Sequence, residues 1–184
     1  MSDRLFFAFW PDDALRAEIA ASSAGWLQDY PCRAQRPDQW HLTVAFLGAV
    51  DADRQPALRD AAKSIEASWV EPQTLVLDRI ELWRKPQVLC VSASEVPVAV
   101  RSLVTALEAA LESRGFPLQR REFRPHLTLA RKARLAVAPR SIRPIHWPVR
   151  TLWLMRSISD ATGSRYEPCA SWNLIQTLTP ALSR

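Results

Sequence analysis

Two of the three histidines in this chain stand in the same short pattern, a histidine with a threonine two positions later. The patterns are His41-Leu42-Thr43-Val44 and His126-Leu127-Thr128-Leu129. An imidazole has an ordinary pKa of about 6.5 and can give or take a proton near neutrality, and a hydroxyl can donate a hydrogen bond to an oxyanion. Two such pairs suit in-line displacement at phosphorus, in which one histidine accepts a proton from water and the other protonates the departing oxygen.

The spacing of each pattern brings the imidazole and the hydroxyl together if the motif lies in a strand. Residues two apart in a strand point to the same face of the sheet. His41 and Thr43 should therefore project together into a cleft, and so should His126 and Thr128. The apolar residues between and after them are expected to face a core behind the site.

The same alternation makes a prediction for the aromatic residues around the first motif. Trp40 and Phe46 are both expected to face away from the two histidines, into the core. The chain has eight tryptophans, and most of them are expected to serve core packing because tryptophan is usually largely buried. Any ring beside the cleft could stack on an RNA base.

Other residues that could do chemistry form weaker patterns. The third histidine, His146, has no threonine two positions later and is expected to be structural. Two histidines without a paired carboxylate or a cysteine cluster make a poor metal site, since zinc usually takes three or four protein ligands. The sequence has no Gly-x-Ser-x-Gly motif and no glycine-rich phosphate loop. We therefore expect no metal and no cofactor.

Hydrophobic periodicity predicts the elements that would position these motifs. Strands are predicted at residues 5–10, 41–47, 74–83, 87–92, 126–130, 150–158 and 166–178. Helices are predicted from residues 11–13 to about residue 30, at 51–68 and at 97–114. This order of elements indicates an α+β fold with largely antiparallel sheets and flanking helices.

The chain contains an internal repeat around the two motifs. Residues 40–45 match residues 125–130, and each copy follows a polar or basic loop. Two similar half-units that face each other would place the two motifs across a shared cleft. With 184 residues, the chain is expected to form a single domain over 1–184 with two lobes, one motif at 41–44 and the other at 126–129.

Charge and composition point to a polyanionic partner. The chain has 24 Lys and Arg against 19 Asp and Glu, and eight of the basic residues lie between Arg120 and Arg143 beside a single acid, Glu122. Such a block makes a field that attracts polyanions. The three cysteines are dispersed, and no signal sequence or membrane-length apolar run is present. These features predict a cytoplasmic protein that does not enter a membrane.

The motifs and their surroundings resemble the two-histidine phosphoesterase superfamily, and within it the RNA 2′,3′-cyclic phosphodiesterases, also called 2′-5′ RNA ligases. The resemblance runs through most of the chain, over residues 4–8, 36–48, 123–131 and 166–172. It implies a bilobal α+β fold in which two pseudo-symmetric sheets flank a central cleft. It also implies hydrolysis of RNA 2′,3′-cyclic phosphate ends, tRNA fragments among them, to 2′-phosphomonoesters by a monomer without metal.

The resemblance assigns a role to each motif residue. It makes His41 the proton donor to the leaving 3′ oxygen and His126 the proton acceptor from water. Thr43 and Thr128 would hold the phosphate oxygens. Arg131 matches a basic residue that often follows the second motif, but strict alternation places it on the face opposite His126. It can reach the phosphate only if the strand ends or bulges near residue 130.

Three alternatives remain open at this stage. The enzyme could also run in reverse and join a 5′-hydroxyl to the cyclic phosphate as a 2′-5′ linkage, without ATP. A phosphodiesterase of a small cyclic nucleotide would need the same two histidines. An RNA-end binding protein with incidental turnover would need the basic block but not two titratable groups.

Overall fold

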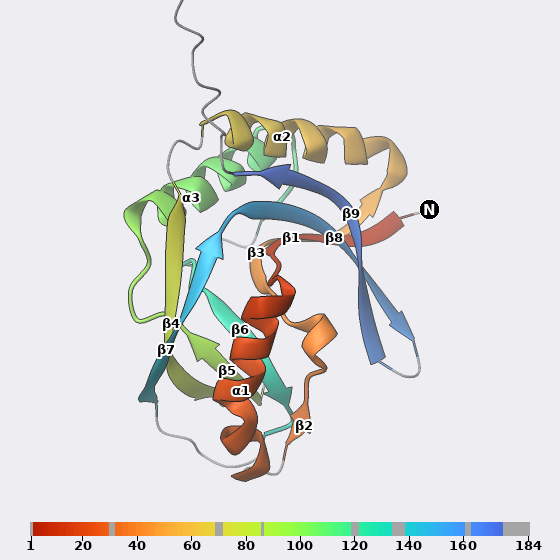
Figure 1. The fold of residues 1–184 in the computed structure, drawn as a ribbon. Helices are drawn as coiled ribbons and strands as arrows, with labels where there is room; N and C mark the ends of the chain where they lie inside the picture. The colour runs from red at the N-terminus through yellow and green to blue at the C-terminus, as the bar shows by residue number, and fades with distance from the viewer. Residues whose placement is uncertain are drawn as a thin grey trace, which may run out of the picture.

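The backbone is organised around one strongly twisted antiparallel sheet of nine strands (Figure 1). The computed structural model describes residues 2–29, 32–68, 72–85, 87–118, 122–133, 139–160 and 163–174. The strands are β1 (Ser2–Phe9), β2 (Arg33–Ala34), β3 (Leu42–Asp51), β4 (Gln73–Trp83), β5 (Val88–Ser92), β6 (His126–Arg131), β7 (Arg140–Val149), β8 (Thr151–Asp160) and β9 (Gly163–Asn173). The helices are α1 (Asp13–Asp29), α2 (Gln55–Ser68) and α3 (Val98–Glu112), with short 3-10 turns η1 (Pro37–Gln39) and η2 (Ala52–Arg54).

The strand order divides the sheet into two halves of four strands. The order is β7-β4-β5-β6-β3-β1-β8-β9, and β2 adds to the edge of β6. The two motif strands, β3 and β6, are the central neighbours, and they join through the single pair Leu42–Leu127. The α+β class and the antiparallel pairing are confirmed, and the two predicted sheets are the halves of one sheet joined at this pair.

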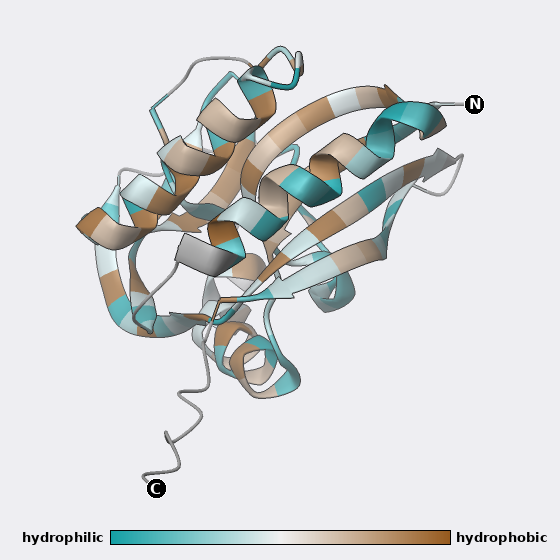
Figure 2. Ribbon diagram, turned by 90° about the horizontal axis from the view of Figure 1, so that it is seen from above, coloured by the Kyte–Doolittle hydropathy of each residue, from teal (hydrophilic) through white to brown (hydrophobic). Residues whose placement is uncertain are grey.

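The helices cover the sheet from the face opposite the motif side chains. In Figure 1, α2 and α3 lie side by side above one half, and α1 crosses the half that contains β6 and β7. Apolar and polar residues alternate along most helices and strands, as Figure 2 shows. The apolar stripe of α3 packs into the main core through Val100, Leu103, Val104, Leu107 and Leu111, all buried.

Most predicted elements are present, and two strands were missed. The strand β7 was missed because Pro144 and Pro148 interrupt its sequence, and proline cannot donate to a strand ladder. The structure resolves the conflict by placing β7 at an edge of the sheet, where an unpaired side is tolerated. The two-residue strand β2 is too short to give a periodic signal. Residues 175–178 of the last predicted strand lie outside the described residues.

Within the described part of the chain, no helix has the length and apolar character that crossing a membrane requires.

The pair that joins the two halves should carry a large share of stability. Leu127 is fully buried against the core, so Leu127→Ala should lower the free energy of unfolding by about 2–5 kcal/mol in a urea titration. The matched control is Val98→Ala at the start of α3, where the side chain is 78% exposed and the change should stay within about 0.5 kcal/mol. If both substitutions lowered the free energy of unfolding equally, the pair would not carry the share of stability assigned to it.

Candidate active site

The pairing of the central strands brings the two motifs together. Leu42 lies opposite Leu127 in an antiparallel pair, and both side chains are fully buried. The residues on either side of each leucine therefore project from the other face of the sheet. These are the four side chains predicted to act together: His41, Thr43, His126 and Thr128. The structure thus places all four on one face, although the role of each remains a prediction.

β3 has a bulge directly after Thr43. The adjacent β1 residues Ala8 and Phe7 pair with Thr43 and Ala45, so Val44 between them has no partner residue in β1. A bulge resets the alternation of side chains, so Phe46 points to the same face as Thr43. Its side chain is 49% exposed. The prediction that Phe46 faces the core is wrong because it assumed unbroken alternation, whereas Trp40 is buried as predicted.

β6 has a bulge at the equivalent position. Two neighbouring residues of β5 pair with Thr128 and Ala130, which leaves Leu129 as the extra residue. Arg131 therefore turns to the face of Thr128, which is the condition under which it can reach a bound phosphate. Residues 41–46 and 126–131 follow the same sequence of half-buried, buried and exposed side chains, position by position. An exposed phenyl ring and an exposed guanidinium thus occupy equivalent positions in the two halves.

Both imidazoles are held in the same way by the backbone. Nδ1 of His41 lies 2.7 Å from the carbonyl oxygen of Gln39, and Nδ1 of His126 lies 2.8 Å from that of Arg124. A carbonyl oxygen can only accept, so each Nδ1–H donates to it. The other ring nitrogen, Nε2, is left to exchange a proton with a molecule in the cleft. This tautomer suits a general base directly, and a general acid once Nε2 is protonated.

Aromatic rings surround His41. Its ring centroid lies 5.0 Å from that of Phe6, 4.9 Å from that of Tyr166 and 5.4 Å from that of Trp10, whose plane is nearly parallel to the imidazole. Burial among these rings lowers the pKa of His41 to about 4, because it removes water from the charged form. The positive charges of His126 and Arg131 lower it further, against the effect of the Gln39 carbonyl.

His126 lies in a more polar setting. The indole ring of Trp83 is 4.1 Å from it between centroids. The Arg124 guanidinium lies over Trp83 and within 3.6 Å of the Glu81 carboxylate, which accepts a hydrogen bond from Ser92. Burial is the main cause that lowers the pKa of His126 below its ordinary value. The nearby Glu81 carboxylate opposes this shift by stabilising the protonated ring.

Two adjoining cavities open over the motif face. A cavity of about 390 Å³, which we call the central cavity, is lined by His41, Thr43, Phe46, Arg131 and three serines of β8 and β9. A second, of about 480 Å³, which we call the apolar cavity, shares Thr43 and Phe46 with it and extends to His126. The two histidines therefore open onto neighbouring parts of one recess. Such a recess is large enough for a nucleotide-sized ligand.

The sequence reasoning missed the residues that surround the first histidine. Phe6, Ala8 and Trp10 alternate along the end of β1 and share one face, which could have been read from their spacing of two. Tyr166 comes from β9, more than 120 residues after His41 in the chain, and no local pattern links it to the motif. The contact between them depends on the long-range pairing of β1 with β8 and of β8 with β9.

The basic block between residues 120 and 143 is divided in the structure. Arg124 pairs with Glu81, Arg131 lines the central cavity, and Arg140 lies over the ring of Trp26 in α1. Of these three, Arg124 and Arg131 line the two adjoining cavities of the motif face. Arginines from other segments, Arg33, Arg36 and Arg165, line a third cavity together with Arg131.

Comparison with known proteins agrees with this geometry. The family model described as LigT-like phosphoesterase matches residues 11–90 and 91–158. The chain belongs to the LigT-like phosphoesterase family. It is 34% identical to an RNA 2′,3′-cyclic phosphodiesterase of Escherichia coli over 94% of this chain and 97% of that protein. A Bacillus subtilis protein of the same name is 32% identical over 52% of this chain and 53% of its own length.

A solved structure of a LigT-like phosphoesterase has the same fold. The crystal structure of E. coli LigT complexed with 3′-AMP superposes with a TM-score of 0.83 and 28% sequence identity. The superposition covers 96% of this chain and 100% of that chain. The match therefore includes both halves of the sheet.

The protonation of the two histidines can be tested without substrate. Imidazole NMR, assigned with His41→Gln and His126→Gln variants, should show both rings as the Nδ1–H tautomer at neutral pH. The His41 signal should titrate with a pKa of about 4 and the His126 signal below 6.5. Inorganic phosphate should raise both pKa values, because a nearby anion stabilises each imidazolium. Titration of either free ring above 6.5 would contradict this account of burial.

Proposed function

We propose that this chain hydrolyses RNA 2′,3′-cyclic phosphate ends to 2′-phosphomonoesters, with His41 as general acid and His126 as general base. The observation that carries the proposal is the arrangement of two imidazoles on one sheet face, each with Nδ1 bound to a backbone carbonyl and Nε2 left for proton transfer. The names of the E. coli and B. subtilis relatives support the same substrate class.

The reaction needs one proton removed from the attacking water and one proton delivered to the leaving 3′ oxygen. Water attacks phosphorus opposite the 3′ oxygen, and Nε2 of His126 accepts its proton as the new P–O bond forms. The bond from phosphorus to the 3′ oxygen breaks, and Nε2–H of His41 protonates that oxygen. The product carries a 2′-phosphate and a 3′-hydroxyl. Exchange with solvent then restores the starting protonation of both rings.

Threonine hydroxyls and a guanidinium would stabilise the charge on the phosphoryl oxygens. Thr43 and Thr128 stand beside the histidines on the same face, where each can donate a hydrogen bond to a non-bridging oxygen. Arg131 lines the central cavity and brings a permanent positive charge. Phe46 offers an exposed ring on which the terminal base can stack.

Substrate binding is expected to prepare His41 for its role as the acid. Because burial lowers the pKa of His41 to about 4, its neutral form dominates near pH 7. The cyclic phosphodiester carries one negative charge, and its arrival between the rings favours the imidazolium. The parallel ring of Trp10 also presents its π face to that cation. Proton uptake by His41 is therefore coupled to the binding of an anion.

The proposal keeps three wider expectations. By microscopic reversibility, the same groups can join a 5′-hydroxyl to a cyclic phosphate as a 2′-5′ linkage without ATP. The reaction is proposed to proceed without metal in a cytoplasmic monomer. Within the described residues, no group of three or more His, Cys, Asp or Glu side chains is placed to hold a metal ion.

Loss of either histidine should remove most of the activity. His41→Ala and His126→Ala should each lower kcat on a 2′,3′-cyclic nucleotide by about 10²–10⁴-fold, the usual contribution of a positioned general acid or base. The matched control is His146→Ala. His146 is exposed on β7, which β4 and β5 separate from β6, and its loss should leave kcat unchanged. Near-normal turnover by either motif variant, with the fold intact by circular dichroism, would refute the assignment.

Product analysis tests the direction of ring opening and the need for metal. An oligoribonucleotide ending in a 2′,3′-cyclic phosphate should give a 2′-phosphate and a free 3′-hydroxyl, resolved by chromatography against both isomers. The rate should not change in EDTA, because proton transfer by two imidazoles does the work of a metal. A 3′-phosphate product would reverse the leaving group, and complete loss of activity in EDTA would favour a metal enzyme.

A further inference from the structure

A third cavity adjoins the central cavity on the side of β2 and β9. It measures about 460 Å³, and the described residues of its lining include four arginines, Arg33, Arg36, Arg131 and Arg165, and no carboxylate. We call it the arginine cavity. It shares Arg131, Ser164 and Tyr166 with the central cavity. A ligand bound between the histidines therefore has a strongly basic recess immediately beside it.

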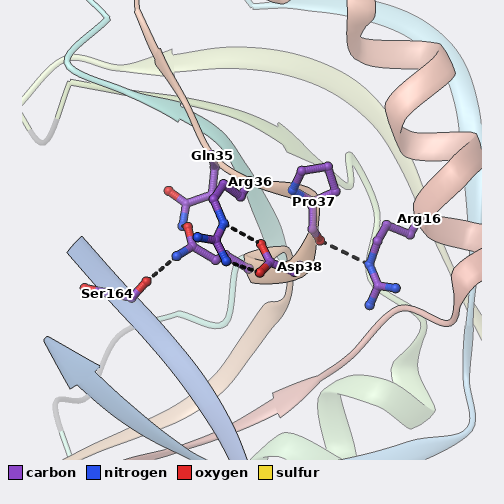
Figure 3. Close-up of polar contacts among 7 residues, drawn as sticks. Arg16, Gln35, Arg36, Pro37, Asp38 and Ser164 are labelled. Atoms are coloured by element: carbon purple, nitrogen blue, oxygen red, sulfur yellow. Dashed lines mark hydrogen bonds and ion pairs between the residues drawn. The ribbon is translucent and has the colours of Figure 1, made fainter. Parts of the chain in front are cut away.

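The walls of the arginine cavity are fixed by contacts between distant segments (Figure 3). The Gln39 side chain donates a hydrogen bond from η1 to the backbone carbonyl of Ser164 in β9, and Gln35 donates to Gln39 at 2.8 Å. Next to Ser164, the Arg33 guanidinium packs against Gly163, where an added Cβ would lie 3.3 Å from it. Contacts between separate segments of the fold therefore hold the shape of the cavity.

Its charge remains positive after internal ion pairs are counted. Arg36 pairs with Asp38 and Arg165 pairs with Glu167, each two residues away. The lining thus brings four guanidiniums against these two carboxylates. Ion pairs between exposed groups are weak and exchange readily, so both paired arginines can also turn to an anion.

The apolar cavity on the other side of the motifs has the opposite character. Its lining contains three aromatic rings, Phe46, Trp83 and Phe123, and its two carboxylates, Glu108 and Glu122, outnumber its one guanidinium, Arg124. Aromatic rings favour a nucleobase, and carboxylates repel a phosphate. The two flanks of the recess therefore differ in what they can hold, one suited to a base and the other to phosphate.

We propose that the arginine cavity binds the phosphodiester on the 5′ side of the terminal nucleotide, so that the chain prefers RNA ends to cyclic mononucleotides. This inference rests on the proposed function. With the cyclic phosphate between the histidines and the terminal base toward Phe46, the preceding phosphate is one ribose away. Arg131 lies between the two positions because it lines both cavities.

Three substrates isolate the charge of that phosphodiester. They are a 2′,3′-cyclic mononucleotide, a dinucleotide with the same cyclic end, and the same dinucleotide with a neutral methylphosphonate linkage. The wild-type protein should show kcat/KM about tenfold higher for the charged dinucleotide than for the neutral one, as expected for charge-assisted contacts. The difference should shrink as salt is added.

Paired substitutions locate the effect. Arg36→Gln with Arg165→Gln should reduce the charged-to-neutral ratio to about twofold. Both side chains are more than half exposed, at 71% and 58%, so the fold should be preserved. The matched control is Arg79→Gln with Arg101→Gln, which removes the same charge from another cavity of about 440 Å³. That cavity adjoins the apolar cavity and shares no lining residue with the arginine cavity. That control should keep the wild-type ratio.

The outcomes separate this inference from the function on which it rests. A wild-type ratio near one, with the mononucleotide hydrolysed, would overturn the phosphate site and leave the phosphodiesterase intact. The phosphate site would also be overturned if the Arg36/Arg165 variant and the control variant lost the charged-to-neutral ratio equally. The ratio would then depend on the net charge of the protein and not on the arginine cavity. If none of the three substrates is hydrolysed, the proposed function falls and the inference falls with it.

Discussion

The pairing of Leu42 with Leu127 is the constraint on which the site depends. Behind the sheet these two side chains are buried in the core, and in front of it their neighbours form the motif face. One residue pair thus sets both the join between the halves and the relative positions of two histidines 85 residues apart in the chain. A slip of one residue at this pair would turn one motif from the cleft to the core.

The two bulges extend the same symmetry beyond the motifs. Each follows its threonine and brings the fifth residue after the histidine onto the motif face. The repeated backbone then presents different chemistry, a phenyl ring at Phe46 and a guanidinium at Arg131. A ring suits a base and a guanidinium suits a phosphate, so under the proposed function the two equivalent positions would contact different parts of a nucleotide.

Local sequence patterns predict much of this structure. The rest depends on contacts between residues far apart in the chain. The motifs, the helices and the α+β class follow from spacings of two and of about 3.6 residues. The position of Phe46 did not follow, because a bulge depends on pairing with β1. Nor did the aromatic surroundings of His41 or the arginine cavity, whose members come from segments far apart in the chain. The prolines of β7 prevented its prediction for a related reason. A strand tolerates proline at the edge of a sheet, and the sequence alone does not show which strand lies at the edge.

Gln39 has two attachments that together link the cleft to the tip of the hairpin formed by β8 and β9. Its backbone carbonyl accepts from the His41 ring, and its side chain donates to Ser164. A shift of that hairpin would therefore pull on the same residue that sets the tilt of the imidazole. Because Ser164 also lines the arginine cavity, a displacement of the hairpin at that cavity would reach the His41 ring through a single glutamine.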